Sequence, residues 1–216
     1  MSLAYAFEDL GDPAQDGLAD ALMRHGVRMA FAKDEEIYAQ EDGTEFVYAV
    51  VRGGVRTIRL MSDGRRQIGE FYYAGEVFGL EPGPERRYAA EALCECEVLV
   101  LKRSALRRLA DDESLERAVW QATRRELERT QGHLMLLGRK TACERVASFL
   151  ADMVERRGSG AVDLPMSRQD IADYLGLTIE TVSRMLTQLQ TSRIVEFAGC
   201  RHFQVRNHDA LSRLAA

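Results

Sequence analysis

The chain of 216 residues has only four cysteines, four prolines and one tryptophan. It also lacks any run of about 18 uninterrupted apolar residues, the length that a membrane-spanning helix needs. Its first residues, MSLAYAFEDLGDPAQD, are acidic, whereas a secretion signal starts with a basic stretch. The sequence therefore predicts a cytoplasmic protein with no membrane partner, in which the cysteines form no disulfide framework.

Common enzyme motifs are absent as well. The sequence has no glycine-rich phosphate loop with a lysine, no His-Glu-x-x-His and no nucleophile elbow. We therefore expect no enzymatic activity. Hydrophobic residues make up 46% of the chain, enough to bury real cores, and the length favours two domains.

Charge is distributed unevenly along the chain. Up to Gly138 there are 25 acidic and 18 basic residues, a net charge of −7, whereas from Arg139 onward 11 basic residues exceed 9 acidic ones, a net charge of +2. An anionic partner therefore belongs with the C-terminal part.

The first half of the chain has the pattern of an antiparallel β-structure. After a short helix at about Pro13 to His25, β-branched and aromatic residues alternate with turn signals, and the Asp63-Gly64 pair marks a hairpin. The segment AEALCECEVLVLKRS alternates as a single strand, with Cys94 and Cys96 on its apolar face. We interpret these two thiols as core residues rather than a redox pair.

A long helix is predicted after the β-structure by apolar periodicity and the absence of proline. Its two apolar faces consist of Leu115, Val119 and Ala122, and of Trp120, Leu127 and Leu134. One face can pack on the chain's own β-structure, and the other on a second copy of the helix, which predicts a homodimer. The alternative is a core helix without a partner. A following helix carries Cys143 on its apolar face and ends at the turn RGSG.

The segment MSRQDIADYLGLTIETVSRMLTQLQ predicts two short helices joined by a tight turn. Ser167 and Asp170 form the pattern of a capping box, Gly176 suits a left-handed turn, and Thr178 caps the second helix. Ala172 falls where the helices cross and only a small side chain fits. This is the pattern of a helix-turn-helix.

The second of these helices presents polar side chains near its N-terminus. The candidate base-reading residues are Ile179, Glu180, Thr181, Ser183 and Arg184. Arg184 can donate two hydrogen bonds to guanine, and Glu180 can accept one from a base amino group. Phosphates would repel a glutamate that read no base, so Glu180 favours sequence-specific binding. The alternative is an exposed ion pair between Glu180 and Arg184 in a domain that binds no DNA.

The segment RIVEFAGCRHFQVRN predicts two strands joined at Gly199, a wing beside the helices. The candidate phosphate-positioning residues are Ser167, Arg168, Thr178, Arg201 and His202. Such contacts orient a protein on DNA without selecting sequence. Cys200, at the wing turn, is a possible redox thiol whose oxidation would impede DNA docking.

This order of elements resembles the Crp/Fnr family of bacterial transcription regulators over nearly the whole chain, and GRRQIGEFYYAGEVFGLE and MSRQDIADYLGLTIETVSR are most similar to its FixK type. The resemblance implies an α+β fold with three parts. These are a sensory antiparallel β-roll similar to the cyclic-nucleotide-binding jelly roll at 1–112, a dimerisation helix at 113–138, and a winged helix-turn-helix DNA-binding domain at 139–216.

The same resemblance implies a dimeric transcription activator that recognises a TTGA…TCAA palindrome in double-stranded DNA. Arg184 would read the guanine, Glu180 the base opposite or next to it, and Ser183 the outer A·T pairs. RNA polymerase is an expected partner, and microaerobic or nitrogen-related metabolism the expected target.

Departures from the family argue against its usual effectors. Iron–sulfur members have a cysteine cluster before the roll, and this chain has no cysteine before Cys94. Cyclic-nucleotide binders use a Gly-Glu turn and an Arg-Ser pair, which are Gly79-Leu80 and Arg86-Arg87 here. The ribose acceptor and the phosphate hydroxyl are thus missing, so we expect no cofactor, metal or cyclic nucleotide. We interpret Arg86 and Arg87 as an exposed charged rim, the remnant of an effector site.

The alternative is an effector-switched regulator of the same family. Arg86 and Arg87 would then bind a small anion, or haem would bind through His25 or His133, or a thiol would sense redox state.

Overall fold

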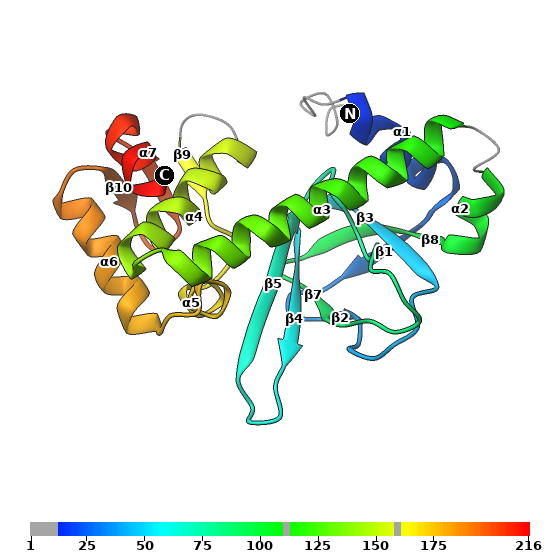
Figure 1. Ribbon diagram of the computed structural model, residues 1–216, viewed down its shortest axis with the longest axis horizontal. Coiled ribbons are helices and arrows are strands. Elements are labelled where there is room, and N and C mark those ends of the chain that lie inside the picture. The colour runs from blue at the N-terminus through cyan, green and yellow to red at the C-terminus, as the bar shows by residue number, and fades with distance from the viewer. Residues whose placement is uncertain (1–12, 110–112, 158–160) are drawn as a thin grey trace. The chain divides into compact units, whose positions relative to one another are not determined.

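The computed structural model describes residues 13–109, 113–157 and 161–216, so the predicted RGSG turn falls largely outside the described residues. The chain divides into two compact units, Met1–Glu128 and Arg129–Ala216. The elements of the first unit are α1 (Pro13–His25), β1 (Val27–Phe31), β2 (Glu36–Tyr38), β3 (Phe46–Arg52), β4 (Gly54–Leu60), β5 (Arg66–Tyr73), β6 (Val77–Phe78), β7 (Ala89–Ala92), β8 (Cys96–Lys102), α2 (Arg103–Leu109) and the first part of α3 (Glu113–Arg139) (Figure 1).

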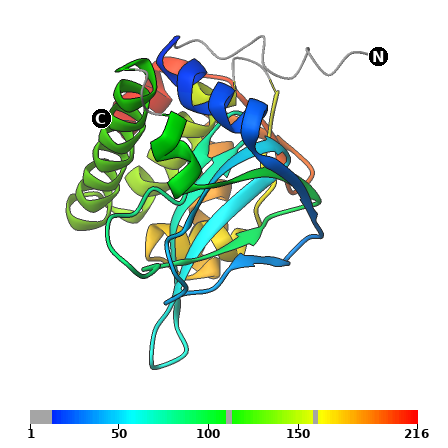
Figure 2. The same cartoon turned by 90° about the vertical axis from the view of Figure 1, so that its right-hand side faces the viewer.

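Two four-stranded antiparallel sheets make up the roll. Their strand orders are β1-β8-β3-β6 and β2-β7-β4-β5. The predicted Asp63-Gly64 hairpin joins β4 to β5, with Gly64 at a φ of 82°. This hairpin extends beyond the rest of the roll in both views (Figures 1 and 2). The predicted antiparallel roll is confirmed.

The strand β3 of the first sheet is buried on both faces. In β3, Tyr48 and Val50 point into a core between the two sheets. Val47, Ala49 and Val51 point the opposite way, into a second core beneath the helices α1, α2 and α3. Because both faces are covered, β3 is an almost unbroken apolar run in the sequence.

The predicted single strand through Cys94 and Cys96 is wrong. β7 ends at Ala92, β8 begins at Cys96, and the backbone bends between them, where the Leu93 amide donates to the Gly54 carbonyl (2.9 Å). β7 and β8 belong to different sheets, so the chain turns a corner here. Strand alternation would place Leu93 on the face opposite the two cysteines, but Leu93 is buried. Cys94 is only half-buried, whereas Cys96 is buried.

Helix α3 has the two predicted apolar faces. Leu115 is buried, and Val119 and Ala122 pack against the helix-covered core. The other face lies open in the single chain. Its side chains have exposed fractions of 69% for Trp120, 56% for Leu127 and 70% for Leu134.

The second unit contains the end of α3 and a small α+β fold. Its further elements are α4 (Ala142–Arg157), β9 (Ala161–Asp163), α5 (Arg168–Leu175), α6 (Ile179–Thr191), β10 (Val195–Ala198), β11 (His202–Val205) and α7 (His208–Ala215). The strands form a sheet in the order β10-β11-β9, so the predicted wing has a third strand that the sequence analysis missed. In the described ranges, no helix is both long and apolar enough to span a membrane.

Candidate nucleic-acid interface

The predicted helix-turn-helix is present as α5 and α6. Ser167 caps α5 in a capping box with Asp170, whose carboxylate is buried and accepts from the Ser167 amide (2.9 Å) and hydroxyl (2.7 Å). Gly176 ends the helix at a φ of 61°, the left-handed conformation that glycine adopts at least cost. Ala172 is fully buried at the helix crossing. The Ser167 hydroxyl is therefore engaged in capping.

Helix α6 separates an apolar face from a polar one. Val182, Leu186 and Leu189 are buried, which fixes the rotation of the helix about its axis. Of the predicted base-reading residues, Ile179, Glu180 and Arg184 are exposed, whereas Thr181 and Ser183 are half-buried beside them. Thr178 caps the helix by accepting from the Thr181 amide (3.3 Å).

Glu180 and Arg184 are oriented independently of each other. Hydrogen bonds from the backbone amide at the helix start and from the Thr178 hydroxyl hold the pKa of Glu180 below its usual range, so this carboxylate stays ionised and can only accept. Arg184 donates to the Thr181 hydroxyl (3.4 Å), and the described structure has no ion pair between Arg184 and Glu180. The competing interpretation, a surface ion pair, thus loses its basis.

The wing places its candidate residues near its turn. Gly199 has a φ of 77°, and Cys200, Arg201 and His202 are all exposed. The His202 Nδ1 lies 3.4 Å from the Asp163 carboxylate on the neighbouring strand β9, so a phosphate would have to compete with that carboxylate.

The remaining candidate, Arg168, is half-buried in the first turn of α5. Its guanidinium carbon lies 6.0 Å from the centre of the Phe197 ring on β10. The contact joins the helix-turn-helix to the wing.

The last turns of α3 are tied to the helix-turn-helix by side chains that sequence reasoning missed. Arg145 donates to the carbonyls of Lys140 (3.0 Å), Leu175 (2.9 Å) and Leu137 (2.7 Å), so one guanidinium satisfies the C-terminal carbonyls of both α3 and α5. The sequence feature that could have predicted this contact is the basic residue Arg145 in the first turn of α4, directly after the end of α3.

His133 is also engaged in this junction. Its ring stacks on Tyr174 with centroids 4.1 Å apart, and its Nε2 lies 2.8 Å from the Tyr174 carbonyl. Burial lowers the pKa of His133, against a smaller opposing effect of that hydrogen bond. The packing and polar contacts of this imidazole are thereby explained without a haem.

The prediction of an exposed rim at the remnant effector site is wrong for Arg86. The Arg86 side chain has no exposed surface, whereas Arg87 is exposed. Arg86 Nη1 donates to the Gly79 carbonyl (2.9 Å) and the Glu81 carboxylate (2.6 Å), and its Nη2 donates to the Phe46 carbonyl (2.5 Å). These acceptors compensate the cost of burying the charge, a compensation that the sequence alone does not reveal.

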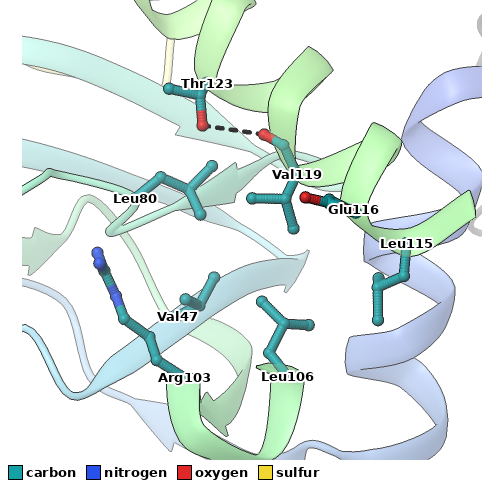
Figure 3. Close-up of a pocket in the computed structure, with 8 residues that line it drawn as sticks. All are labelled: Val47, Leu80, Arg103, Leu106, Leu115, Glu116, Val119 and Thr123. Carbon is teal, nitrogen blue, oxygen red and sulfur yellow. Dashed lines mark hydrogen bonds between the residues drawn. The ribbon is translucent and has the colours of Figure 1, made fainter. Parts of the chain in front are cut away.

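A separate cavity of about 410 Å³ lies on the helix-covered side of the roll (Figure 3). Its lining is both polar and apolar and comes from β3, the segment after β6, α2 and α3. The lining residues are Val47, Leu80, Arg103, Leu106, Leu115, Glu116, Val119 and Thr123. Arg103 reaches the Gly79 and Glu81 carbonyls (both 2.8 Å), and Thr123 donates to the Val119 carbonyl (2.9 Å).

Comparison with known proteins identifies both parts of the chain. The cyclic nucleotide-binding domain family matches residues 28–113, and the Crp-like helix-turn-helix domain family matches residues 144–214.

Two curated relatives are each named nitrogen fixation regulation protein FixK. The one from Azorhizobium caulinodans is 45% identical and covers 99% of this chain and 87% of its own, and the one from Rhizobium meliloti is 44% identical and covers 83% and 82%. The solved structure of FixK2 from Bradyrhizobium japonicum is 50% identical, covers 88% of this chain and 98% of its own, and superimposes with a TM-score of 0.85.

Proposed function

This chain belongs to the Crp/Fnr family of transcription regulators, and on that premise we propose that it binds a TTGA…TCAA palindrome as a homodimer and activates transcription. The polar start of α6 supports this proposal most strongly. Glu180 and Arg184 are exposed there, with Ser183 between them, while the opposite face of the helix is buried. The FixK relatives support target genes of microaerobic or nitrogen-related metabolism.

In the proposed complex, each subunit places α6 in a major groove, and the two grooves lie about 34 Å apart along the DNA. Arg184 pairs with the guanine of each half-site, Glu180 accepts from a neighbouring base amino group, and Ser183 contacts the outer A·T pairs. Ile179 and Thr181 line the same surface. The phosphate contacts come from Ser167, Arg168, Thr178, Arg201 and His202, with the α5 N-terminus and the wing as their supports. The Ser167 hydroxyl would exchange its bond to Asp170 for one to the phosphate.

Three parts of the chain have different proposed roles. Residues 1–112 form the sensory roll, residues 113–138 supply the dimerisation helix through Trp120, Leu127 and Leu134, and residues 139–216 bind DNA. RNA polymerase is the partner that the bound dimer recruits.

We further propose that no cyclic nucleotide is required. The burial of Arg86 supports this, because a guanidinium already bonded to a carboxylate and two carbonyls is not available for a phosphate. The same geometry weakens the alternative in which Arg86 and Arg87 bind a small anion.

A pair of arginine variants tests base reading. Arg184→Ala should cost about 1–3 kcal/mol on the palindrome and relax discrimination at one base pair per half-site. Arg201→Ala is the matched control, and it should weaken binding to specific and scrambled duplexes alike. Fluorescence anisotropy against both duplexes measures the difference, and equal losses on both duplexes for Arg184→Ala would show that Arg184 reads no base.

A further inference from the structure

Besides its hydrogen-bond acceptors, the Arg86 guanidinium has aromatic rings beside it. The Arg86 guanidinium carbon lies 4.4 Å from the centre of the Tyr38 ring and 5.6 Å from that of Tyr48. The Tyr48 ring stacks in turn on Phe78, with ring centres 5.1 Å apart. Ring faces attract cations, so the aromatic wall adds to the attraction of the Glu81 carboxylate.

All these groups have the same chemical preference. The guanidinium meets one carboxylate, two carbonyl oxygens and two ring faces, each of which is negative or electron-rich toward it. Such a lining binds a planar cation and repels a phosphate. Space is also tight, because a Cβ on Gly79 would lie 2.9 Å from the Arg86 Nη1, and Gly79 has a φ of +78°.

We propose that the interior of the roll is a binding site for a guanidinium cation that the chain fills with its own Arg86, and that this internal occupant holds the roll in its DNA-competent state. The second half of this inference rests on the proposed function. The first half stands on the contacts of Arg86 alone.

A hydrogen bond leads from this site to α3. The Tyr72 ring packs on Phe78, with centres 5.3 Å apart, and its hydroxyl donates to the Glu126 carboxylate (2.7 Å). Within the first unit, the aromatic cluster that holds Arg86 therefore also holds the helix whose open face carries Leu127. Emptying the site should loosen this attachment.

The sharpest test is chemical rescue. Arg86→Ala in the full-length chain should lower Tm by about 10 °C, because the half-buried Glu81 carboxylate and the carbonyls of Gly79 and Phe46 lose their donor. Millimolar ethylguanidinium, which reproduces the end of the deleted side chain, should recover part of this loss in Arg86→Ala and add nothing to the wild type. Urea, a neutral molecule of similar shape, and sodium chloride at equal concentration should not rescue.

Two matched variants complete the stability test. Arg87→Ala removes the exposed neighbouring arginine and should leave Tm unchanged with no response to ethylguanidinium. Tyr38→Leu should lower Tm, whereas Tyr38→Phe should not, because the Tyr38 hydroxyl is buried and has no hydrogen-bond partner among the described residues. Because the Tyr38 ring also packs on Tyr48 and Phe78, its loss does not isolate the contact with the guanidinium. Where Arg86→Ala fails to fold, Arg86→Lys, which keeps the charge and loses the planar fork, should still lower Tm, and a wild-type Tm in Arg86→Lys would overturn the planar-cation site.

The proposal is overturned by a wild-type Tm in Arg86→Ala, by rescue with urea as strong as with ethylguanidinium, or by equal losses in Tyr38→Phe and Tyr38→Leu.

Binding to the palindrome tests the second half of the proposal, the link between Arg86 and DNA competence. Folded Arg86→Ala should bind at least about 10-fold more weakly and recover with ethylguanidinium, and unchanged binding would refute the link to DNA competence. If ethylguanidinium restores the Tm of Arg86→Ala but the wild-type protein does not bind the palindrome, the guanidinium site stands and only the proposed function is refuted.

Discussion

Two arginines each follow a glutamate closely in the sequence, and their surroundings give them opposite roles. Arg86 bonds to Glu81, five residues before it, in a place where its side chain has no exposed surface. Arg184 follows Glu180 by four residues on an exposed helix face and contacts Thr181 instead. Charge pattern alone does not distinguish them. Burial makes Arg86 part of the roll, and exposure leaves Arg184 able to meet another molecule.

Sequence periodicity could predict the position of Arg184 but not that of Arg86. Arg184 lies on a helix whose buried face repeats at regular spacing, so its direction follows from Val182, Leu186 and Leu189. Arg86 follows a segment with two prolines and a glycine, where no period fixes the direction of side chains. Its burial depends on acceptors from Phe46 and Gly79, which lie far from each other in sequence.

The four thiols should differ widely in reactivity. Cys200 is exposed at the wing turn, whereas burial raises the pKa of the Cys96 thiol to about 11. At about pH 8 only about one Cys96 thiol in a thousand is ionised, and the thiolate is the reacting form. Titration of the native protein with Ellman's reagent should give a fast phase from Cys200, and Cys96 should react only on unfolding or at strongly alkaline pH.

Cys200→Ser provides the control. It should remove the fast phase and leave the slow phases unchanged, and a fast phase that survives would assign the reactive thiol elsewhere. The same variant tests the redox hypothesis for the wing: equal weakening of DNA binding by peroxide in both proteins would rule out Cys200 as the sensor.

Elements with their own period or cap could be predicted, and those that depend on distant partners could not. Helices α5 and α6 begin and end close to their predicted residues, because Ser167, Thr178 and Gly176 act locally. β9 is only three residues long and is defined by pairing with β11, so the local sequence gives no sign of it. The corner between Ala92 and Cys96 was missed because alternation continues through it in the sequence.

The open face of α3 carries the prediction of a dimer. Leu127→Lys should raise the dimer dissociation constant by roughly 100-fold or more, because each copy would bury a charge where an apolar side chain packed before. Gly132→Lys is the control, because it lies about 140° around the same helix from Leu127 and an added side chain there meets open space, so it should leave assembly unchanged. Sedimentation equilibrium measures both. A Leu127→Lys protein that associates as the wild type does would place the contact elsewhere.

At the scale of the whole molecule, the chain separates its charges by task. The net charge of −7 up to Gly138 and of +2 beyond it confines favourable contact with a polyanion to the C-terminal part. Such a small positive charge gives limited non-specific affinity, so in the proposed complex the side chains of α6 supply much of the selectivity. In the roll, Arg86, the proposed counterpart of the arginine that binds a cyclic phosphate in relatives, is already paired to Glu81.

The most direct measurement is therefore the affinity of purified protein, without any additive, for a TTGA…TCAA duplex and for a scrambled duplex at the same salt concentration. We expect a dissociation constant of about 10⁻⁸ M or lower for the palindrome and binding at least about 1,000-fold weaker to the scrambled duplex. Binding that appears only after a cyclic nucleotide or another effector is added, or equal affinity for both duplexes, would contradict the proposed function.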